Sequence, residues 1–581
     1  MPGRKSISHR IKDTFRSAES DYPLHASICK NDLSTMQEVL GSPEAPYLLS
    51  TGDGRWGTPL HVAVYLDNIK AVNRLLQAGA DVTAESSTYK HNLLPLALAV
   101  RVGNQRLLWR LWQHLNLQKD ENEKNVDLCL FQALINSQIT VLRALLTWKE
   151  WTTEVKNEAL LWAARSWKVY SAQLLTSEWS FCQDILDQAL HCAVDFKPLL
   201  DDDFKLDYNG DDYLQQQLLI AHLVNVGANP NTIIDGRPPI IIAARHIDLV
   251  GAFKVLLDKG ANPDATDHKG KTALHFLGSP TALHQCGPVV RLNETAIRIL
   301  LEHKPSVLQS DNKCGANPLH AAAFGSNLDT LQSYLSSLPL EQRSQALGSK
   351  NNYDETLLHY ASAGAKCDIV EFLLSQGLDV NGPTTNSWTP LHCALTPARR
   401  GSQLNGSAKS ILEAVKISQL LLFHGADPHA TTAEGWTPLH CLSLFGGKKK
   451  DDMELNQFVD SLIHRGVDVN ARATFIFWNE LGDIGPKYHY WGHEVYTSIQ
   501  DPEASGAIVR FGYSPIHFAA ANGNLTMAKT LLSHGADPLS KDERGNTAIK
   551  IAANSSLMDD LPSRKQAIVQ LLTEAAHLSQ S

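Results

Sequence analysis

The sequence predicts an all-α solenoid, a stack of helix–turn–helix units joined by short β-hairpin fingers. Three observations carry this prediction. The segment 388–394 (Trp-Thr-Pro-Leu-His-Cys-Ala) recurs almost unchanged at 436–441, and its Thr position recurs at 238, 272, 317, 356, 389, 437, 514 and 547. Leu-Leu pairs followed by Gly recur between these positions. A fixed internal period of this kind indicates stacked repeats that share one continuous core.

The Thr-Pro-Leu-His motif has the chemistry of a helix start. Thr offers an oxygen to free backbone N–H groups, and Pro fits the first helical turn, where no donor is needed. Leu then points into a core, and His holds a polar ring one turn in. The motif also stands at 58–61 and, in altered form, at 22–25, 272–275, 317–320, 356–359 and 514–517.

A second helix of each unit ends in a recurrent turn. Leu75-Leu76 is followed by Gly79, Leu256-Leu257 by Gly260, and Leu531-Leu532 by Gly535. Gly just past a helix end supplies the left-handed cap. The Asp or Asn and Pro that follow turn the chain toward the next unit.

These residues resemble ankyrin repeats, in both the motif and the period near 33 residues. The resemblance implies about 12–14 repeats and a concave surface of fingers and first helices. The mixture of strong repeats, weak repeats and long insertions is similar to the large ankyrin proteins of filamentous fungi.

The motif divides the chain into seven parts. A polar basic N-terminal segment (1–20) precedes regular repeats at 21–87, degenerate ankyrin-like helical repeats at 88–235, and repeats with loop insertions at 236–471. An aromatic-rich insertion (472–512), C-terminal repeats with a cap (513–574) and a tail (575–581) follow. We expect the segment 1–20 to form a frayed helical cap over the first repeat, which is favoured over a targeting or docking peptide.

The insertion 472–512 enters where a short finger is expected. It holds Phe475, Phe477, Trp478, Tyr488, Tyr490, Trp491 and Tyr496. A loop this long is uncommon unless it is functional or disordered, and the aromatic content argues against disorder. It is the best candidate for a specific site.

Composition argues against several classes of partner. Lys and Arg number 52 against 61 for Asp and Glu, for a net charge of −9. The chain therefore has no global basic field for nucleic acid, and we expect neither nucleic-acid binding nor membrane insertion. Nine Cys without a C-x-x-C pair indicate reduced thiols and an intracellular protein, cytoplasmic or nuclear.

The histidines of the repeated motif are expected to have a structural role. Eight of the 24 His occupy the fourth position of the repeated motif, which explains their presence without a metal. His489 and His493, with Glu494 beside them, are weak metal candidates in the insertion, and an aromatic loop with His as polar filler is favoured over them. No cofactor is expected.

The predicted function is that of a non-catalytic scaffold or adaptor for protein partners, by analogy with the resembled family. The chain shows no recognised reaction signature, so it is not expected to be an enzyme. The alternative is an enzyme or a small-molecule or metal binder whose pocket forms between 472–512 and the concave face. For the tryptophans at the fingers, packing against the next finger competes with a role as exposed anchors. The candidate partner-binding residues are Arg55, Trp56, His268, Lys269, Ser387, Trp388, Glu434, Trp436, Trp478, Tyr490 and Trp491.

Overall fold

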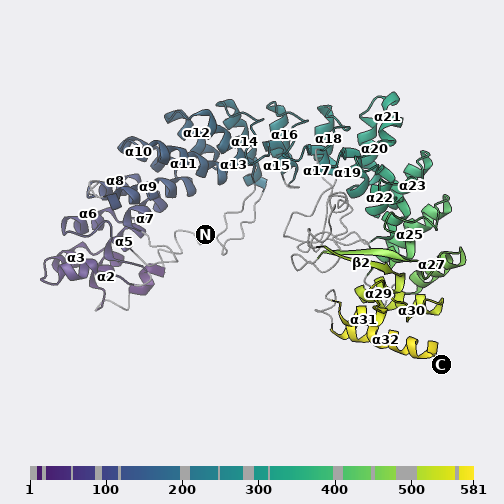
Figure 1. Ribbon diagram of the computed structural model, residues 1–581. Coiled ribbons are helices and arrows are strands. Elements are labelled where there is room, and N and C mark those ends of the chain that lie inside the picture. Colours follow the sequence, from purple (N-terminus) through teal and green to yellow (C-terminus); the bar gives the residue numbers. More distant parts are fainter. Residues whose placement is uncertain are drawn as a thin grey trace. The chain divides into compact units, whose positions relative to one another are not determined.

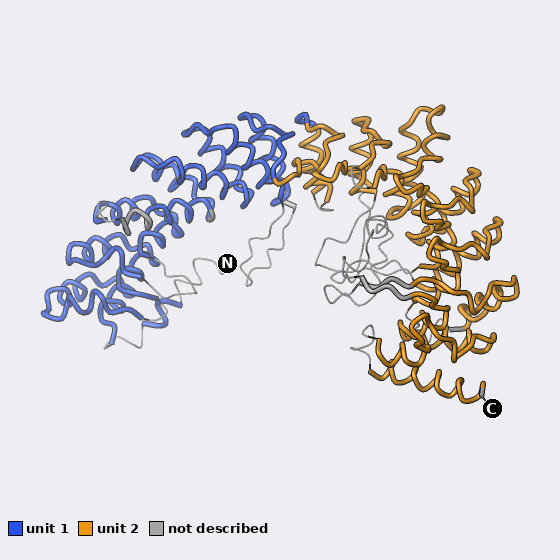
Figure 2. Tube along the Cα trace, in the orientation of Figure 1, with its two compact units in different colours: residues 1–234, 258–260 blue, residues 235–257, 261–581 orange. Residues whose placement is uncertain are grey.

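The computed structural model divides the chain into two compact units. Unit 1 comprises 1–234 and 258–260, and unit 2 comprises 235–257 and 261–581 (Figure 2). The structure describes residues 10–15, 21–53, 56–85, 94–115, 120–195, 210–245, 249–278, 294–311, 314–396, 410–445, 452–478, 507–555 and 562–580.

Over its described residues, unit 1 consists of helix pairs with a helical turn at residues 10–15 and an additional helix, α4 (Ala45–Ser50). The pairs are α2 (Pro23–Lys30) with α3 (Leu33–Leu40), α5 (Pro59–Tyr65) with α6 (Ile69–Gln77), α7 (Pro95–Val102) with α8 (Gln105–Trp112), α9 (Asp120–Ile135) with α10 (Ile139–Trp148), α11 (Thr153–Arg165) with α12 (Val169–Glu178), and α13 (Gln183–Val194) with α14 (Gly210–Asn225). Helix pairs are thus present where the motif erodes.

Unit 2 continues the same plan (Figure 1). Its pairs are α15 (Pro239–Ala244) with α16 (Val250–Asp258), α17 (Ala273–Gly278) with α18 (Glu294–Glu302), α19 (Pro318–Gly325) with α20 (Leu328–Ser336), α22 (Leu357–Ala363) with α23 (Cys367–Ser375), α24 (Pro390–Leu395) with α25 (Ile411–Phe423), α26 (Pro438–Leu442) with α27 (Asp452–His464), α29 (Pro515–Asn522) with α30 (Leu525–Ser533), and α31 (Ala548–Ala553) with α32 (Pro562–Gln580). An extra helix, α21 (Leu340–Leu347), follows α20. The described helices form fourteen pairs, at the upper end of the predicted range.

In the described part of the chain, an antiparallel ribbon interrupts the helices. Strand β1 (Ala473–Trp478) pairs with β2 (Ala507–Tyr513), with an irregularity between Ala473 and Phe475. The two strands are the ends of the predicted insertion, so the insertion leaves the stack as an extended finger. Residues 479–506 lie outside the described part of the chain.

The sequence explains both helices of a pair. In α24 and α26 the N-cap Thr is extended, Pro follows it, and the side chains of Thr and His cap each other's backbone N–H groups. Second helices begin at residues such as Asn68 and Asn104, whose side chains accept N–H groups of the first turn. Gly79, which follows α6, has φ +89°, a left-handed conformation that favours glycine.

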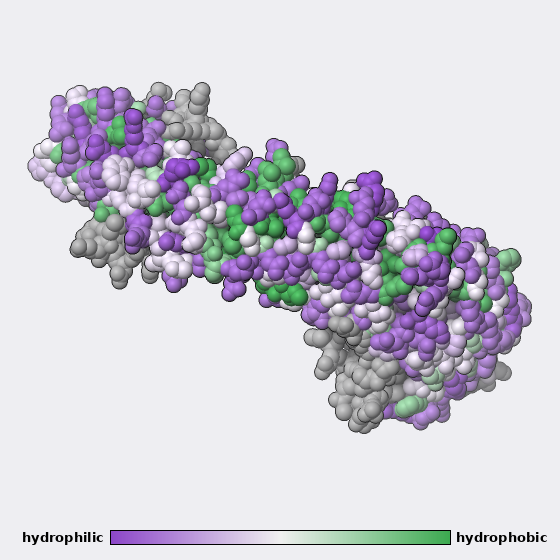
Figure 3. All heavy atoms as spheres, turned by 90° about the horizontal axis from the view of Figure 1, so that it is seen from above, coloured by the Kyte–Doolittle hydropathy of each residue, from purple (hydrophilic) through white to green (hydrophobic). Residues whose placement is uncertain are grey.

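The core runs between the two helices of each pair. Small residues such as Ala322, Ala361 and Ala520 are fully buried, which lets neighbouring first helices approach closely. Leu on both helices fills the remaining space. Seen from above, hydrophilic residues cover much of the described surface, with hydrophobic patches among them (Figure 3).

The N-terminal segment supplies the end of this core. A helical turn covers residues 10–15, and its Ile11 and Phe15 are buried. Phe15 stacks on His25 of α2 with ring centroids 4.7 Å apart. Part of the predicted N-terminal cap is therefore in place. Among the described helices, none has the length and apolar content to cross a bilayer.

Candidate protein-binding surface

A row of buried histidines joins successive first helices in unit 2. In each ring the Nδ1 accepts the N–H of the N-cap residue, with N–N distances of 3.0 to 3.3 Å. The Nε2 bonds a backbone carbonyl farther along the chain, with N–O distances of 3.0 to 3.3 Å. The rings and carbonyls are His275 with Ala316, His320 with Glu355, His359 with Trp388, His392 with Trp436, His440 with Tyr513, and His517 with Ser540.

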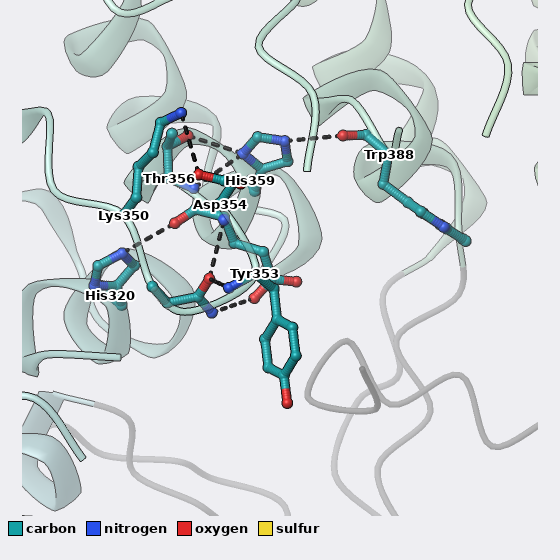
Figure 4. A network of polar contacts seen from close by, with 9 residues as sticks. His320, Lys350, Tyr353, Asp354, Thr356, His359 and Trp388 are labelled. Atoms are coloured by element: carbon teal, nitrogen blue, oxygen red, sulfur yellow. Dashed lines mark hydrogen bonds and ion pairs between the residues drawn. The ribbon is translucent and has the colours of Figure 1, made fainter. Parts of the chain in front are cut away.

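This geometry assigns a neutral tautomer to the ring. In the rings whose N-cap residue is Thr or Ser, Nδ1 accepts from a backbone N–H, so the proton sits on Nε2, which donates to the carbonyl. In His320 the Nδ1 also lies 2.7 Å from the Oδ1 of Asn317. Burial lowers the pKa to about 4 in His320 and His392 and to about 3 in His440, because it penalises the charged ring. Figure 4 shows two links of the row, at His320 and His359. Both ring nitrogens are engaged, so these histidines act as structural bridges.

Several short fingers of unit 2 close around a polar side chain at their base. The carboxylate of Asp542 accepts the N–H groups of Arg544 and Asn546, and the amide oxygen of Asn351 accepts those of Tyr353 and Glu355. These contacts satisfy the backbone of a tight turn without water. The finger therefore has a defined shape before any partner arrives.

Successive fingers are also bonded to one another through the backbone. An N–H of one finger donates to a carbonyl of the preceding one, with N–O distances of 2.8 to 3.2 Å. We call this set of contacts the finger ladder. Its bonds are His268 to Gly236, Asn352 to Cys314, Thr385 to Tyr353, Ala433 to Asn386, Thr474 to Glu434, and Glu543 to Phe511. The last two bonds place the β1–β2 ribbon within the ladder.

The tryptophans of the fingers lie inside the structure. Trp56 is 3% exposed, Trp388 is 9% exposed and Trp436 is 0% exposed. Trp388 and Trp436 contact each other with ring centroids 5.7 Å apart, and the Trp436 Nε1–H donates to the Thr474 carbonyl at 2.6 Å. Of the two alternatives, the structure shows packing: Trp388 and Trp436 lie against neighbouring fingers, and the Trp56 Nε1–H donates to the Thr14 hydroxyl. Their contact with a partner stays a prediction.

The polar candidates lie at finger tips. His268, Lys269 and Ser387 are exposed, and Glu434 is half-buried with its carboxylate accepting the Thr432 hydroxyl. Ser387 has φ +60°, which a turn of this tightness requires. The structure thus brings His268, Lys269, Ser387 and Glu434 to one edge of unit 2.

The remaining candidates cannot be placed. Arg55, His489, Tyr490, Trp491, His493 and Glu494 lie outside the described residues, as does the side chain of Trp478. The predicted pocket under 472–512 and its metal ligands therefore stay predictions. Over the described residues, no group of three His, Cys, Asp or Glu side chains could hold a metal ion.

Sequence reasoning missed a groove on the other side of unit 2. A cavity of about 460 Å³ lies between α18 and α20, lined in part by Ile297, Leu301 and Thr330, with Glu294 and Asp329 among its polar groups. The groove depends on the packing of two helices from different repeats. No single motif could have indicated it.

Comparison with known proteins identifies the repeats. Models of the ankyrin repeat match residues 57–87 and 386–433, and models described as ankyrin repeats in many copies match 358–405 and 502–552. The resemblance inferred from the motif is confirmed, while the likeness to fungal proteins stays a prediction.

Individual relatives match over short segments. The Caenorhabditis elegans "Ankyrin repeat and LEM domain-containing protein 1 homolog" is 47% identical over 51 residues, or 9% of this chain and 7% of that protein. The mouse "RelA-associated inhibitor" is 54% identical over 39 residues, or 7% and 5%. The human "Transient receptor potential cation channel subfamily A member 1" is 27% identical over 181 residues, or 30% and 15%.

Each match therefore covers a small part of the relative's length, and the similarity concerns the repeats. Ankyrin repeats are generally non-catalytic and usually mediate protein–protein interaction. The motif, the helix pairs and these matches agree: the chain is an ankyrin repeat protein.

Proposed function

We propose that the protein is a non-catalytic scaffold or adaptor that binds partner proteins on the concave surface of unit 2, formed by the fingers and the first helices. The observation that carries the proposal is the finger ladder. It holds successive finger tips in fixed positions through backbone bonds. The exposed polar side chains at these tips supply the contacts.

The physical argument is preorganisation. A surface loses less conformational entropy on binding when its backbone is already fixed, so more of the contact free energy appears as affinity. The buried histidine row and the indole contacts fix the same fingers from below. Tip side chains can therefore vary without disturbing the support.

Within this proposal, the partner contacts are made by the side chains that are exposed at the finger tips. His268 and Lys269 lie on one finger, and Ser387 lies on a finger farther along unit 2. We assign the partner contacts first to these three, and to Glu434 as a half-buried neighbour. Trp388 and Trp436 act on binding through the support they give to the fingers.

Affinity purification from the native cell with mass spectrometry tests the proposal. Three forms are compared with the intact chain: Lys269→Glu with Ser387→Asp, a form lacking 479–506, and the control Lys254→Glu. Lys254 is exposed on the second helix α16, away from the fingers. We expect a stoichiometric protein that the control retains and the tip variant loses.

Two other results would contradict the proposal. Equal retention by the tip variant and the control would remove the fingers from the binding site. A small molecule or metal that co-purifies with the intact chain and is lost with 479–506, without any protein partner, would favour the pocket hypothesis instead.

A further inference from the structure

Three neighbouring second helices of unit 1 carry basic residues and no acidic ones. The helices α6, α8 and α10 hold Lys70, Arg74, Arg106, Arg110 and Arg143, and their sequences contain neither Asp nor Glu. We call these five side chains, with Trp109 among them, the basic stripe. The stripe is a local excess of positive charge on a chain whose net charge is −9, so the overall composition does not predict it.

The basic residues are in register from helix to helix. Lys70 and Arg106 each stand two positions after an N-cap Asn, at Asn68 and Asn104, and the helices α6 and α8 are in contact. Arg74 and Arg110 follow four residues later, one helical turn along. The side chains therefore form a small grid with steps of about 6 Å along a helix and about 10 Å between helices.

Most of this charge is available to solvent. Lys70, Arg106, Arg110 and Arg143 are exposed. Arg74 donates to the Leu33 carbonyl at 2.6 Å and to the Gln37 side chain at 3.1 Å, so it is partly used within the fold. Arg143 lies 3.9 Å from Glu178 in an exposed pair, which contributes little at physiological salt.

An exposed aromatic residue lies within the stripe. Trp109 is 41% exposed and stands next to Arg110 on α8. Its ring contacts Trp148 of α10 with centroids 5.0 Å apart, and Trp148 also contacts Trp112 at 5.0 Å. The indole is therefore held rigidly while part of it remains open. Rigid, partly exposed Trp and Arg are the residue types that dominate binding energy at protein interfaces.

Acidic residues bound the stripe on both sides. Glu38 is exposed on α3, before α6, and Glu178 is exposed on α12, after α10. The basic surface is thus three helices wide, about 20 to 30 Å. A long polyanion or an anionic membrane would extend over the acidic borders, whereas a short acidic segment would not.

We propose that the basic stripe binds an acidic, amphipathic segment of a partner protein. Its carboxylates pair with Lys70, Arg106, Arg110 and Arg143, and an apolar side chain between them packs on Trp109. This surface is separate from the finger ladder of unit 2 and does not depend on the proposed function. It gives the chain a second binding site of a different chemistry.

Fluorescence polarisation with the full chain tests the proposal. The probe is a labelled helical peptide of about 18 residues with Glu at i and i+4 and Leu between them. Arg106→Glu with Arg110→Glu should weaken binding at least about tenfold, and Trp109→Ala should weaken it by a similar factor. The matched control, Lys254→Glu with Lys529→Glu, removes two exposed cations from other second helices and should change binding less than about twofold.

The remaining outcomes all contradict the proposal. They are absence of peptide binding, equal weakening by the control pair, and equal binding of a peptide with Gln in place of Glu. Displacement of the peptide by oligouridine or by phosphatidylserine vesicles in a stripe-dependent way would assign the surface to nucleic acid or to a membrane. Circular dichroism checks the fold, and if the Glu variant is unfolded, Arg106→Gln with Arg110→Gln replaces it with the same expectation.

Discussion

At the scale of the residue, the motif histidine is the smallest unit that links one repeat to the next. His392 is fully buried, and it joins the N-cap Thr389 to the Trp436 carbonyl of the following repeat. Replacing it leaves the buried Thr389 N–H without its acceptor and leaves a cavity, and the Trp436 carbonyl keeps only its bond from the Thr432 N–H. These effects fall on the junction between two repeats.

We expect His392→Ala to lower the free energy of unfolding of unit 2 by about 2–4 kcal/mol. His424→Ala is the control, because His424 is exposed at the end of α25 and should cost less than about 0.5 kcal/mol. Urea unfolding followed by circular dichroism measures both. Equal stabilities of the two variants would remove the structural role of the histidine row.

The same histidines predict a loss of stability in mild acid. The folded pKa is about 4 in His320, His392 and His517 and about 3 in His440, below the unfolded value near 6.5. The unfolded chain therefore binds more protons in this interval. The stabilisation is complete above pH 6.5 and falls as the pH drops toward 4, by up to about 1.4 kcal/mol per pH unit for each ring.

Thermal unfolding between pH 7.5 and 5 measures this slope before most carboxylates titrate. The midpoint should fall steadily below pH 6.5. A variant with His392→Gln and His440→Gln should be less stable at pH 7.5 but show a shallower decline. An unchanged slope in that variant would assign the pH dependence to other groups.

At the scale of the element, close packing of first helices depends on residues without side chains. Gly364 caps the end of α22 with φ −75°, an ordinary conformation, so its backbone does not require glycine. A Cβ there would instead collide with the Phe324 carbonyl oxygen of α19. The constraint is the approach of one repeat to the next.

We expect Gly364→Ala to lower the free energy of unfolding by about 1–3 kcal/mol, because α19 and α22 must move apart. Gly348→Ala is a matched control, since Gly348 ends α21 with φ −83° and its nearest atoms would lie 3.6 Å from the added Cβ. Chemical denaturation compares the two. A larger effect at Gly348 would contradict the packing argument.

At the scale of the whole molecule, the two compact units differ in the interactions that stabilise each of them internally. Unit 2 contains the histidine row and the finger ladder. In unit 1 the full motif stands only at 58–61, with an altered form at 22–25. Unit 1 has a bridge of this kind at His25, whose Nε2 lies 2.9 Å from the Gly57 carbonyl. From α7 onward it relies on apolar packing and on indole contacts such as those of Trp148 and Trp167.

We therefore expect unit 1 to unfold before unit 2. Seven of the twelve Trp lie between Trp109 and Trp179, so intrinsic fluorescence reports mainly on unit 1. The fluorescence transition in urea should precede the transition by circular dichroism, and amide exchange in unit 2 should be the slower. Coincident transitions would show a single cooperative unit instead.

How much the sequence foretells depends on the range of the interaction. The first helices at 390–395 and 438–442 follow from a cap, a Pro and a Leu within a few residues of one another, so the motif predicts them. The insertion at 472–512 also follows from the spacing of the motif. The sequence does not predict that the insertion starts as a β ribbon, because the strands pair residues that are 29 to 40 positions apart in the chain.

The sequence by itself determined the repeat, its helices and its turns, because each depends on local capping and on a period that recurs many times. Tertiary structure alone decided the burial of Trp388 and Trp436, the bonds between fingers and the alignment of Lys70 with Arg106. These features arise only when units far apart in the chain are stacked at a fixed rise. The basic stripe could have been predicted from the sequence, because the three second helices α6, α8 and α10 contain no Asp or Glu. This is apparent only when the charges are counted separately for each helix.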